Sequence, residues 1–179
     1  MGKIIATQLE GEFDVVLVRK LRAPFQHELA IGAIDETGWT TLSPYAGSTG
    51  ADQAYIAEET RHQLQVLRSR RALYSPQCTP IDPAGRTVIV VDDGLATGAT
   101  MTAALHAIRQ QQPHRLICAI PVASASALEA VSPMADEVAC LAVPPEFRAV
   151  GQFYRDFPQV SDDEVVDMLR TRARQRSRP

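Results

Sequence analysis

Runs of apolar residues recur at four places along the chain. They are FDVVLV at residues 13–18, TVIVV at 87–91, RLICAIPVA at 115–123 and EVACLAV at 137–143. In each run the apolar residues mostly follow one another instead of alternating with polar ones. This pattern is typical of strands that are buried on both faces, as in a parallel sheet. The sequence therefore predicts four strands of a mainly parallel sheet.

Segments with helical spacing lie between the later runs. Residues 101–112, MTAALHAIRQQQ, place Ala104, Leu105 and Ile108 on one side, and residues 124–131 form a second, shorter case. Strands that alternate with helices predict an α/β fold with a doubly wound, mainly parallel sheet.

One longer segment interrupts this alternation. Residues 52–73 carry apolar side chains among many charges, which predicts a long and largely solvated helix. Turn-rich loops flank it, so we interpret residues 41–85 as a peripheral excursion. The length of the chain suits one ordinary domain, and we expect residues 1–179 to form a single domain.

The end of the chain, about residues 161–179, predicts a helix followed by a basic tail. Ser161 and Glu164 form a capping-box pattern that marks the start of the helix. The arginines of the tail could contact nucleic acid, but cations also stabilise a helix C-terminus. We expect no nucleic acid partner. These arginines are Arg170, Arg172, Arg174, Arg176 and Arg178.

Composition narrows the classes of protein to consider. Hydrophobic residues make up 45% and charged residues 22%, as in soluble globular chains. The net charge of −3 gives no global field for nucleic acid or anionic membrane, so local positive groups must bind any anion. No apolar stretch approaches the ~20 residues of a membrane span, and no signal-peptide core opens the chain. Cys78, Cys118 and Cys140 are widely spaced and fit buried free thiols in a reducing compartment. We expect a cytoplasmic protein.

The stretch VIVVDDGLATGAT, at residues 88–100, carries the candidate chemistry. Asp92 and Asp93 follow a buried strand directly, where ligands of parallel sheets bind. Gly94 and Gly98 allow close backbone approach, and the N–H groups of the helix that follows favour phosphate. Carboxylates repel phosphate and instead suit sugar hydroxyls or the water shell of Mg²⁺. The stretch therefore predicts a sugar phosphate site.

Other interpretations of this stretch have less support. A Walker B strand requires a GxxxxGK[ST] partner motif, which the chain lacks. Phospho-acceptor receiver domains usually carry their acidic pair early in the chain. A simple strand end capped by aspartate does not explain two acids beside a glycine-threonine loop. The four histidines show no metal-ligand spacing with one another or with cysteine, so we expect no zinc site.

The same stretch resembles the phosphoribosyl diphosphate (PRPP) binding motif of type I phosphoribosyltransferases. Gly94 departs from the aliphatic residue that is commoner in that motif, but it is similar to the VDDG form of a subgroup of predicted phosphoribosyltransferases. The resemblance to this subgroup extends to VRKLRAPFQHELAIGAI at residues 18–34, AIPVAS at 119–124 and AVGQFYRDFPQVSDDEV at 149–165.

This resemblance implies a reaction and its residues. The family transfers the phosphoribosyl group of PRPP to an acceptor, often a nucleobase, and releases diphosphate. The resemblance implies that Asp92, Asp93 and Lys20 are catalytic. It also implies that Mg²⁺ is bound together with PRPP and contacts the two aspartates through water. The PRPP-binding residues would be Arg19, Lys20, Asp92, Asp93, Gly94, Leu95, Ala96, Thr97, Gly98, Ala99 and Thr100.

Further positions are compatible with a role in the site. Val122, Phe147, Phe153 and Tyr154 are candidates for binding the acceptor, although the aromatic residues could equally pack the sheet edge and the last helix. Residues 21–29, with Arg22, Pro24 and Glu28, are a candidate lid. Arg68, Arg70 and Arg71 could reach a phosphate, but charges on a solvated helix face are the simpler interpretation.

The start of the chain differs from the family pattern. Family members begin the core with a strand that ends in a diphosphate-binding loop, whereas MGKIIATQLEGEFD resembles the helix after that loop. We expect a core without its first strand, through a late start of the reading frame, replacement by another element or loss of efficient catalysis. Exposed sheet edges would then favour a homodimer. Two functions stay open: a PRPP-dependent transferase and a non-catalytic PRPP or nucleotide sensor.

Overall fold

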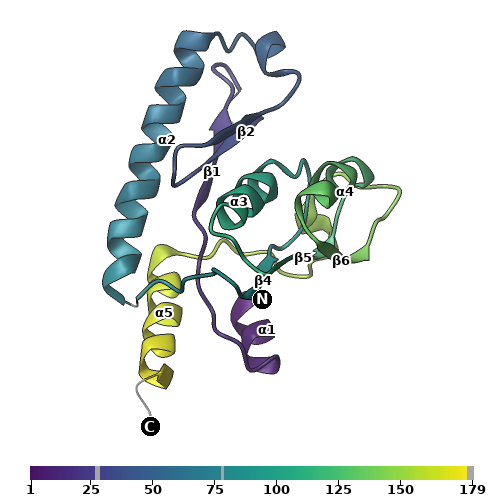
Figure 1. Ribbon diagram of the computed structural model, residues 1–179. Coiled ribbons are helices and arrows are strands. Elements are labelled where there is room, and N and C mark those ends of the chain that lie inside the picture. Colours follow the sequence, from purple (N-terminus) through teal and green to yellow (C-terminus); the bar gives the residue numbers. More distant parts are fainter. Residues whose placement is uncertain (27–28, 78, 177–179) are drawn as a thin grey trace.

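The computed structural model describes residues 1–26, 29–77 and 79–176. It is an α/β fold, as the sequence predicts (Figure 1). The helices and strands in chain order are α1 (Gly2–Gln8), β1 (Val18–Arg22), β2 (Ala30–Asp35), β3 (Thr40–Leu42), α2 (Gln53–Tyr74), β4 (Thr87–Val91), α3 (Ala99–Arg109), β5 (Arg115–Val122), α4 (Ala125–Val131), β6 (Glu137–Ala142) and α5 (Asp162–Arg176). Short 3-10 turns lie at Ala46–Thr49, Ser75–Gln77, Ser132–Met134 and Val150–Phe153.

Three of the predicted strands form a parallel sheet. Its order is β4-β5-β6, and its register places Val90 beside Cys118 and Ile120 beside Cys140. The predicted helices between these strands are confirmed as α3 and α4. Cys118 and Cys140 are free thiols, as expected, but only Cys118 is fully buried, and Cys78 lies outside the described residues.

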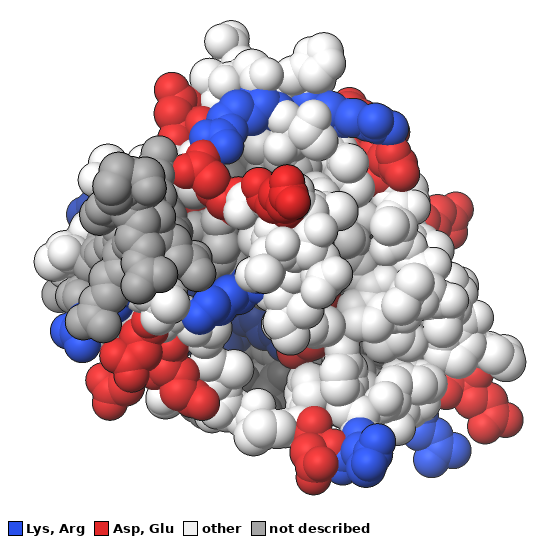
Figure 2. Space-filling view, turned by 90° about the horizontal axis from the view of Figure 1, so that it is seen from below, with Lys and Arg blue, Asp and Glu red and all other residues white. Residues whose placement is uncertain are grey.

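The two faces of the parallel sheet are buried to different extents. The helices α3 and α4 cover one face, where Val90, Leu105 and Cys118 belong to the main core cluster. On the edge strand β6, Leu141 is 85% exposed. The right half of Figure 2, which lies under β5 and β6, is largely uncharged surface. The prediction of burial on both faces is therefore wrong for β6, which no helix covers on the second side within the described chain.

The predicted strand at residues 13–18 is also wrong. Residues 11–17 have no strand structure, and β1 begins only at Val18. Phe13 and Val15 pack against the cluster of Tyr74 and α5, whereas Val16 packs against the core of the parallel sheet. The residues of this run other than Asp14 are apolar because their side chains pack against different hydrophobic clusters as the segment passes between them.

β1 belongs to a second sheet, which is antiparallel and has the order β1-β2-β3. Its register places Val18 opposite Asp35 and Lys20 opposite Ala33. Leu21, Ile34 and the α2 residue Leu67 share a hydrophobic cluster, so α2 covers one face of this sheet. The other face packs against α3, which also contacts β5 of the parallel sheet. One helix therefore joins the two sheets.

The long helix and the last helix are both confirmed. Asp52 caps α2 by accepting a hydrogen bond from the backbone N–H of Tyr55 at 2.8 Å. α5 packs against the end of α2 through Leu169 (Figure 1). Its predicted capping box is present, because Ser161 Oγ accepts from the N–H of Glu164 at 3.3 Å and Glu164 Oε2 accepts from the N–H of Ser161 at 2.8 Å. In the described part of the chain, no helix has the length and apolar character of a membrane span.

Candidate functional site

The acidic turn lies where β4 ends and is attached to the end of β5. Asp92 and Asp93 follow the last residue of β4 directly. The N–H of Leu95 donates to the carbonyl of Val122 at 2.9 Å, and the N–H of Ser124 donates to the carbonyl of Leu95 at 2.9 Å. The Leu95 side chain is buried in the main core. Leu95 therefore anchors the turn, since its side chain, N–H and carbonyl are all used within the fold.

At both glycines of the turn, neighbouring atoms leave too little room for a side chain. A Cβ at Gly94 would lie 2.9 Å from the carbonyl oxygen of Val122 and 2.9 Å from a methyl carbon of Val150. Gly98 has φ +76, and a Cβ there would lie 2.9 Å from a methyl carbon of Val131. The tight packing around Gly94 explains why this chain has glycine where the family motif commonly has an aliphatic residue.

Beyond the acidic turn, the loop opens to solvent at the start of a helix. Ala96 and Thr97 are exposed, and α3 begins at Ala99. Gly98 is the N-cap, and no side chain caps the helix, so the first N–H groups near Thr100 are available to a ligand. Such groups favour phosphate through hydrogen bonds and the helix dipole.

Burial shapes the electrostatics of the two aspartates. Desolvation raises the pKa of Asp92 from 3.8 to about 6, and the negative charge of Asp93 adds to this rise. Desolvation also raises the pKa of Asp93. The N–H of Asp93 donates to Asp92 Oδ1 at 2.9 Å, and this contact lowers the pKa of Asp92. The positive charge of Lys20 lowers the pKa of both carboxyl groups, so Lys20 lies on the same side as the turn.

The predicted basic pair is divided between the two faces of β1. Arg19 Nε donates to Oε1 of Gln63 in α2 at 2.9 Å, on the face that α2 covers. Lys20 is exposed and lies on the opposite face, as alternation along a strand requires. The structure thus brings Lys20 toward the aspartates and turns Arg19 away from them.

The candidate acceptor residues differ in their surroundings. Val122 is 3% exposed, and a methyl carbon of its side chain packs beside Gly94. Tyr154 Oη donates to the main-chain carbonyl of Asp93 at 2.6 Å. The rings of Phe147 and Phe153 are tilted against each other with centroids 5.4 Å apart, and Phe153 is 40% exposed. Of the three aromatic residues, Tyr154 is the one with a hydrogen bond to the acidic turn.

Two of the arginines on α2 contact carboxylates of other elements. Arg71 Nε donates to Glu36 at 2.7 Å, and Arg70 Nε lies 3.4 Å from a carboxylate oxygen of Asp162. Arg68 is exposed. These positions support the interpretation of α2 as a solvated helix that packs on its neighbours.

The candidate lid begins in the core. Leu21 and Arg22 are part of β1, and Leu21 is fully buried. The N–H of Ala23 donates to the carbonyl of Leu29 at 2.9 Å, which closes the hairpin loop. Glu28 lies outside the described residues.

Sequence reasoning did not single out two supports of the turn. Val150 packs beside Gly94, and Ser124 Oγ donates to the carbonyl of Ala96 at 2.8 Å. The matched segments 119–124 and 149–165 contain these residues, but no local pattern assigns them to the turn.

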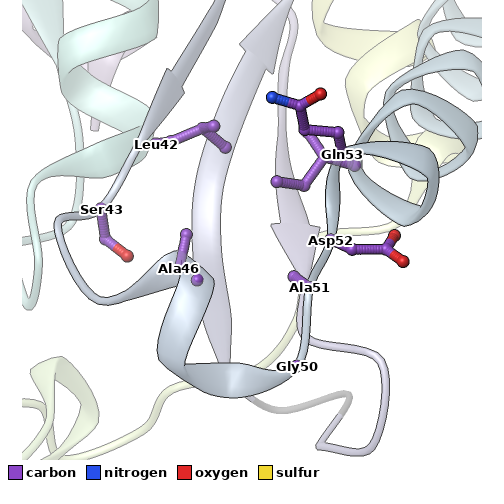
Figure 3. A pocket seen from close by; sticks show the side chains of 9 residues that line it. Leu42, Ser43, Ala46, Gly50, Ala51, Asp52 and Gln53 are labelled. Atoms are coloured by element: carbon purple, nitrogen blue, oxygen red, sulfur yellow. The ribbon is translucent and has the colours of Figure 1, made fainter.

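A surface hollow of about 650 Å³ lies elsewhere, at the start of α2 (Figure 3). Its lining is mainly apolar and includes Leu42, Ala46, Ala51 and Ile56. None of the predicted site residues lines it. Among the described residues, no group of three or more His, Cys, Asp or Glu side chains could hold a metal ion.

A carboxylate pair, an open glycine-containing loop at a helix N-terminus and a nearby lysine thus lie together at the end of β4. A family model of the phosphoribosyl transferase domain matches residues 1–158. The chain belongs to the phosphoribosyl transferase domain family. This membership agrees with the sequence resemblance and with the α/β fold.

Two relatives extend the comparison within the phosphoribosyl transferase family. Proteins of two Mycobacterium tuberculosis strains, each named "Putative phosphoribosyl transferase", are 42% identical over 166 residues, which is 92% of this chain and 38% of theirs. The chain therefore spans about two fifths of the length of these relatives. A crystal structure of a Thermus thermophilus protein is 45% identical and superposes with a TM-score of 0.76, covering 96% of this chain and 81% of that one.

Proposed function

We propose that this chain binds PRPP together with Mg²⁺ and transfers its phosphoribosyl group to a small acceptor, with release of diphosphate. One observation carries the proposal: Asp92 and Asp93 lie at the end of β4, directly before an exposed loop and the uncapped start of α3. This order separates acceptors for sugar hydroxyls from donors for a phosphate. Family membership supports the same general class.

Each part of the turn has a distinct task in this proposal. The carboxylates of Asp92 and Asp93 accept hydrogen bonds from the ribose hydroxyls, and the backbone N–H groups of residues 96–100 bind the 5′-phosphate. Lys20 offsets the negative charge of the departing diphosphate. The reaction therefore depends on positioning and on charge stabilisation.

The two aspartates also fit the expected metal. Mg²⁺ keeps several waters and is usually bound by one or two carboxylates plus substrate phosphates. Asp92 and Asp93 would hold its water shell, and the ion would supply positive charge to the diphosphate. The cytoplasmic location and the homodimer remain proposals of the same kind.

A binding titration tests the proposal. We expect PRPP to bind in the presence of Mg²⁺, and the double variant Asp92→Asn/Asp93→Asn to lose this binding while it stays folded by circular dichroism. Asp82→Asn is the matched control, because Asp82 also accepts a backbone N–H, from Ala84 at 2.9 Å, but is exposed and outside the turn. Unchanged PRPP affinity in the double variant would refute the ribose role.

A second experiment separates transfer from sensing. The position of Arg19, away from the aspartates, leaves Lys20 as the member of the basic pair near the turn and favours a PRPP or nucleotide sensor as the alternative. Diphosphate release is measured with PRPP, Mg²⁺ and a panel of purine and pyrimidine bases. Release with one base supports the transferase, whereas tight binding without release supports the sensor.

A further inference from the structure

Tyr154 reaches the acidic turn from a segment that follows β6. Its Oη donates a hydrogen bond of 2.6 Å to the main-chain carbonyl oxygen of Asp93. Burial, and then the negative charges of Asp93 and Asp92, raise the pKa of Tyr154. The hydroxyl therefore keeps its proton at neutral pH and acts as the donor.

The carbonyl that Tyr154 contacts belongs to the peptide unit between Asp93 and Gly94. The N–H of the same unit, on Gly94, interacts with the carboxylate of Asp93 and lowers its pKa. A peptide unit is planar, so a contact that holds its C=O also sets the direction of its N–H. The Tyr154 hydroxyl and the Asp93 carboxylate are thus connected through one rigid plane.

Other contacts hold the Tyr154 ring in place. Its centroid lies 5.1 Å from that of Phe157, and Phe157 packs closely beside Gly151. Val150, in the same segment, packs beside Gly94. Residues 150–157 therefore support the acidic turn from outside the loop.

We propose that Tyr154 is a positioning residue that holds the Asp93–Gly94 peptide unit so that the Asp93 carboxylate faces the ribose hydroxyls of PRPP. This role rests on the proposed function. It differs from the acceptor-binding role for which the sequence makes Tyr154 a candidate, because the hydroxyl of Tyr154 already contacts the turn and its ring already packs on Phe157.

The variant Tyr154→Phe removes the hydroxyl and keeps the ring. Tyr45→Phe is the matched control, since Tyr45 Oη donates to the main-chain carbonyl of Ala30 at 3.3 Å, in the antiparallel sheet. The first measurement is a ¹³C NMR titration of the aspartate carboxyl carbons without ligand. The second is the titration with PRPP and Mg²⁺, and the melting temperature of each variant is recorded.

We expect Tyr154→Phe to raise the pKa of Asp93 and to weaken PRPP binding roughly three- to tenfold, as the loss of one hydrogen bond predicts. Tyr45→Phe should change neither quantity. If wild-type protein binds PRPP and Tyr154→Phe leaves both the Asp93 titration and the affinity unchanged, the positioning role is wrong and the proposed function stands. If wild-type protein binds no PRPP, the proposed function fails and the ribose role of Tyr154 fails with it.

Discussion

Asp92 is a carboxylate that water reaches only in part. Its pKa is raised to about 6 from 3.8, chiefly by desolvation. A carboxyl group whose pKa is higher in the folded state loses its proton first in the unfolded chain. Its stabilising contribution is therefore complete below about pH 4 and is lost as the pH rises through about 6. Above that pH, the charged side chain destabilises the fold.

We accordingly expect Asp92→Asn to be more stable than wild type at about pH 7.5. The pKa difference limits the increase in the free energy of unfolding to about 3 kcal/mol. Because Asp92 is partly in contact with solvent, we expect an increase of about 1–2 kcal/mol. The gain should disappear toward about pH 4. Urea denaturation at both pH values, with Asp82→Asn as the control, measures it. Equal stability of Asp92→Asn and wild type at both pH values would contradict the argument.

Gly94 is the second residue with a direct consequence. We expect Gly94→Ala to lower the free energy of unfolding by about 1–3 kcal/mol, because the new Cβ would overlap the Val122 carbonyl, which cannot move without shifting β5. Gly47→Ala is the control, since a Cβ there has no neighbour within 4 Å. Thermal unfolding compares the two variants. A stability of Gly94→Ala equal to that of Gly47→Ala would show that the turn can shift.

Strand β1 gives different surroundings to Arg19 and Lys20, which the family resemblance assigns together to PRPP binding. Its alternating geometry points Arg19 at Gln63 of α2 and leaves Lys20 on the side of the aspartates. Gln63 is 2% exposed, so its oxygen loses a partner if Arg19 is replaced. Arg19 is also partly desolvated and is repelled by the like charges of Arg70 and Arg22, so its removal relieves these unfavourable contributions and offsets part of the loss.

The two substitutions should therefore have opposite signatures. We expect Lys20→Met to weaken PRPP binding at least tenfold with little change in stability, since it removes a charge near the ligand. We expect Arg19→Met to cost about 1 kcal/mol of stability and to leave PRPP affinity within about twofold. Isothermal titration and urea denaturation of both variants measure these effects. Loss of PRPP binding in Arg19→Met would contradict this prediction and would show that Arg19 takes part in the site.

Local patterns predicted some elements and missed others. The runs that became β4, β5 and β6, and the periodic segments that became α2, α3 and α4, are long enough for their spacing to determine their type. Residues 13–17 are also apolar apart from Asp14, but they pack against several clusters without a strand partner. Strand pairing involves distant residues, so the antiparallel sheet of β1, β2 and β3 has no comparable local signal.

For the whole molecule, the arrangement of the two sheets determines which strand edges are free to pair with another chain. In the described chain, β1 pairs only with β2, and β4 pairs only with β5. Each of these strands therefore has an edge with backbone groups that are not used in a sheet. Such edges are ready to pair with another chain. The helix α3 holds the two sheets together without closing either edge.

We expect the protein to form a homodimer in solution, because pairing or coverage of these edges satisfies their backbone groups. Light scattering coupled to size-exclusion chromatography should give twice the mass of the 19.5 kDa chain. Hydrogen exchange of the β1 and β4 amides should slow as the concentration rises. A monomer mass at every concentration would refute this expectation.

The sequence by itself determined the α/β class and the helices between the later strands, and it predicted a sugar phosphate site at residues 88–100, because apolar spacing and a run of acidic and small residues are local properties. The tertiary structure decided which member of the basic pair turns toward the aspartates, why Gly94 tolerates no side chain and that Tyr154 contacts the turn. These features depend on side chains brought together from β1, β5 and the segment after β6. Their sequence separation is large, so only the packing of the folded chain determines their contacts.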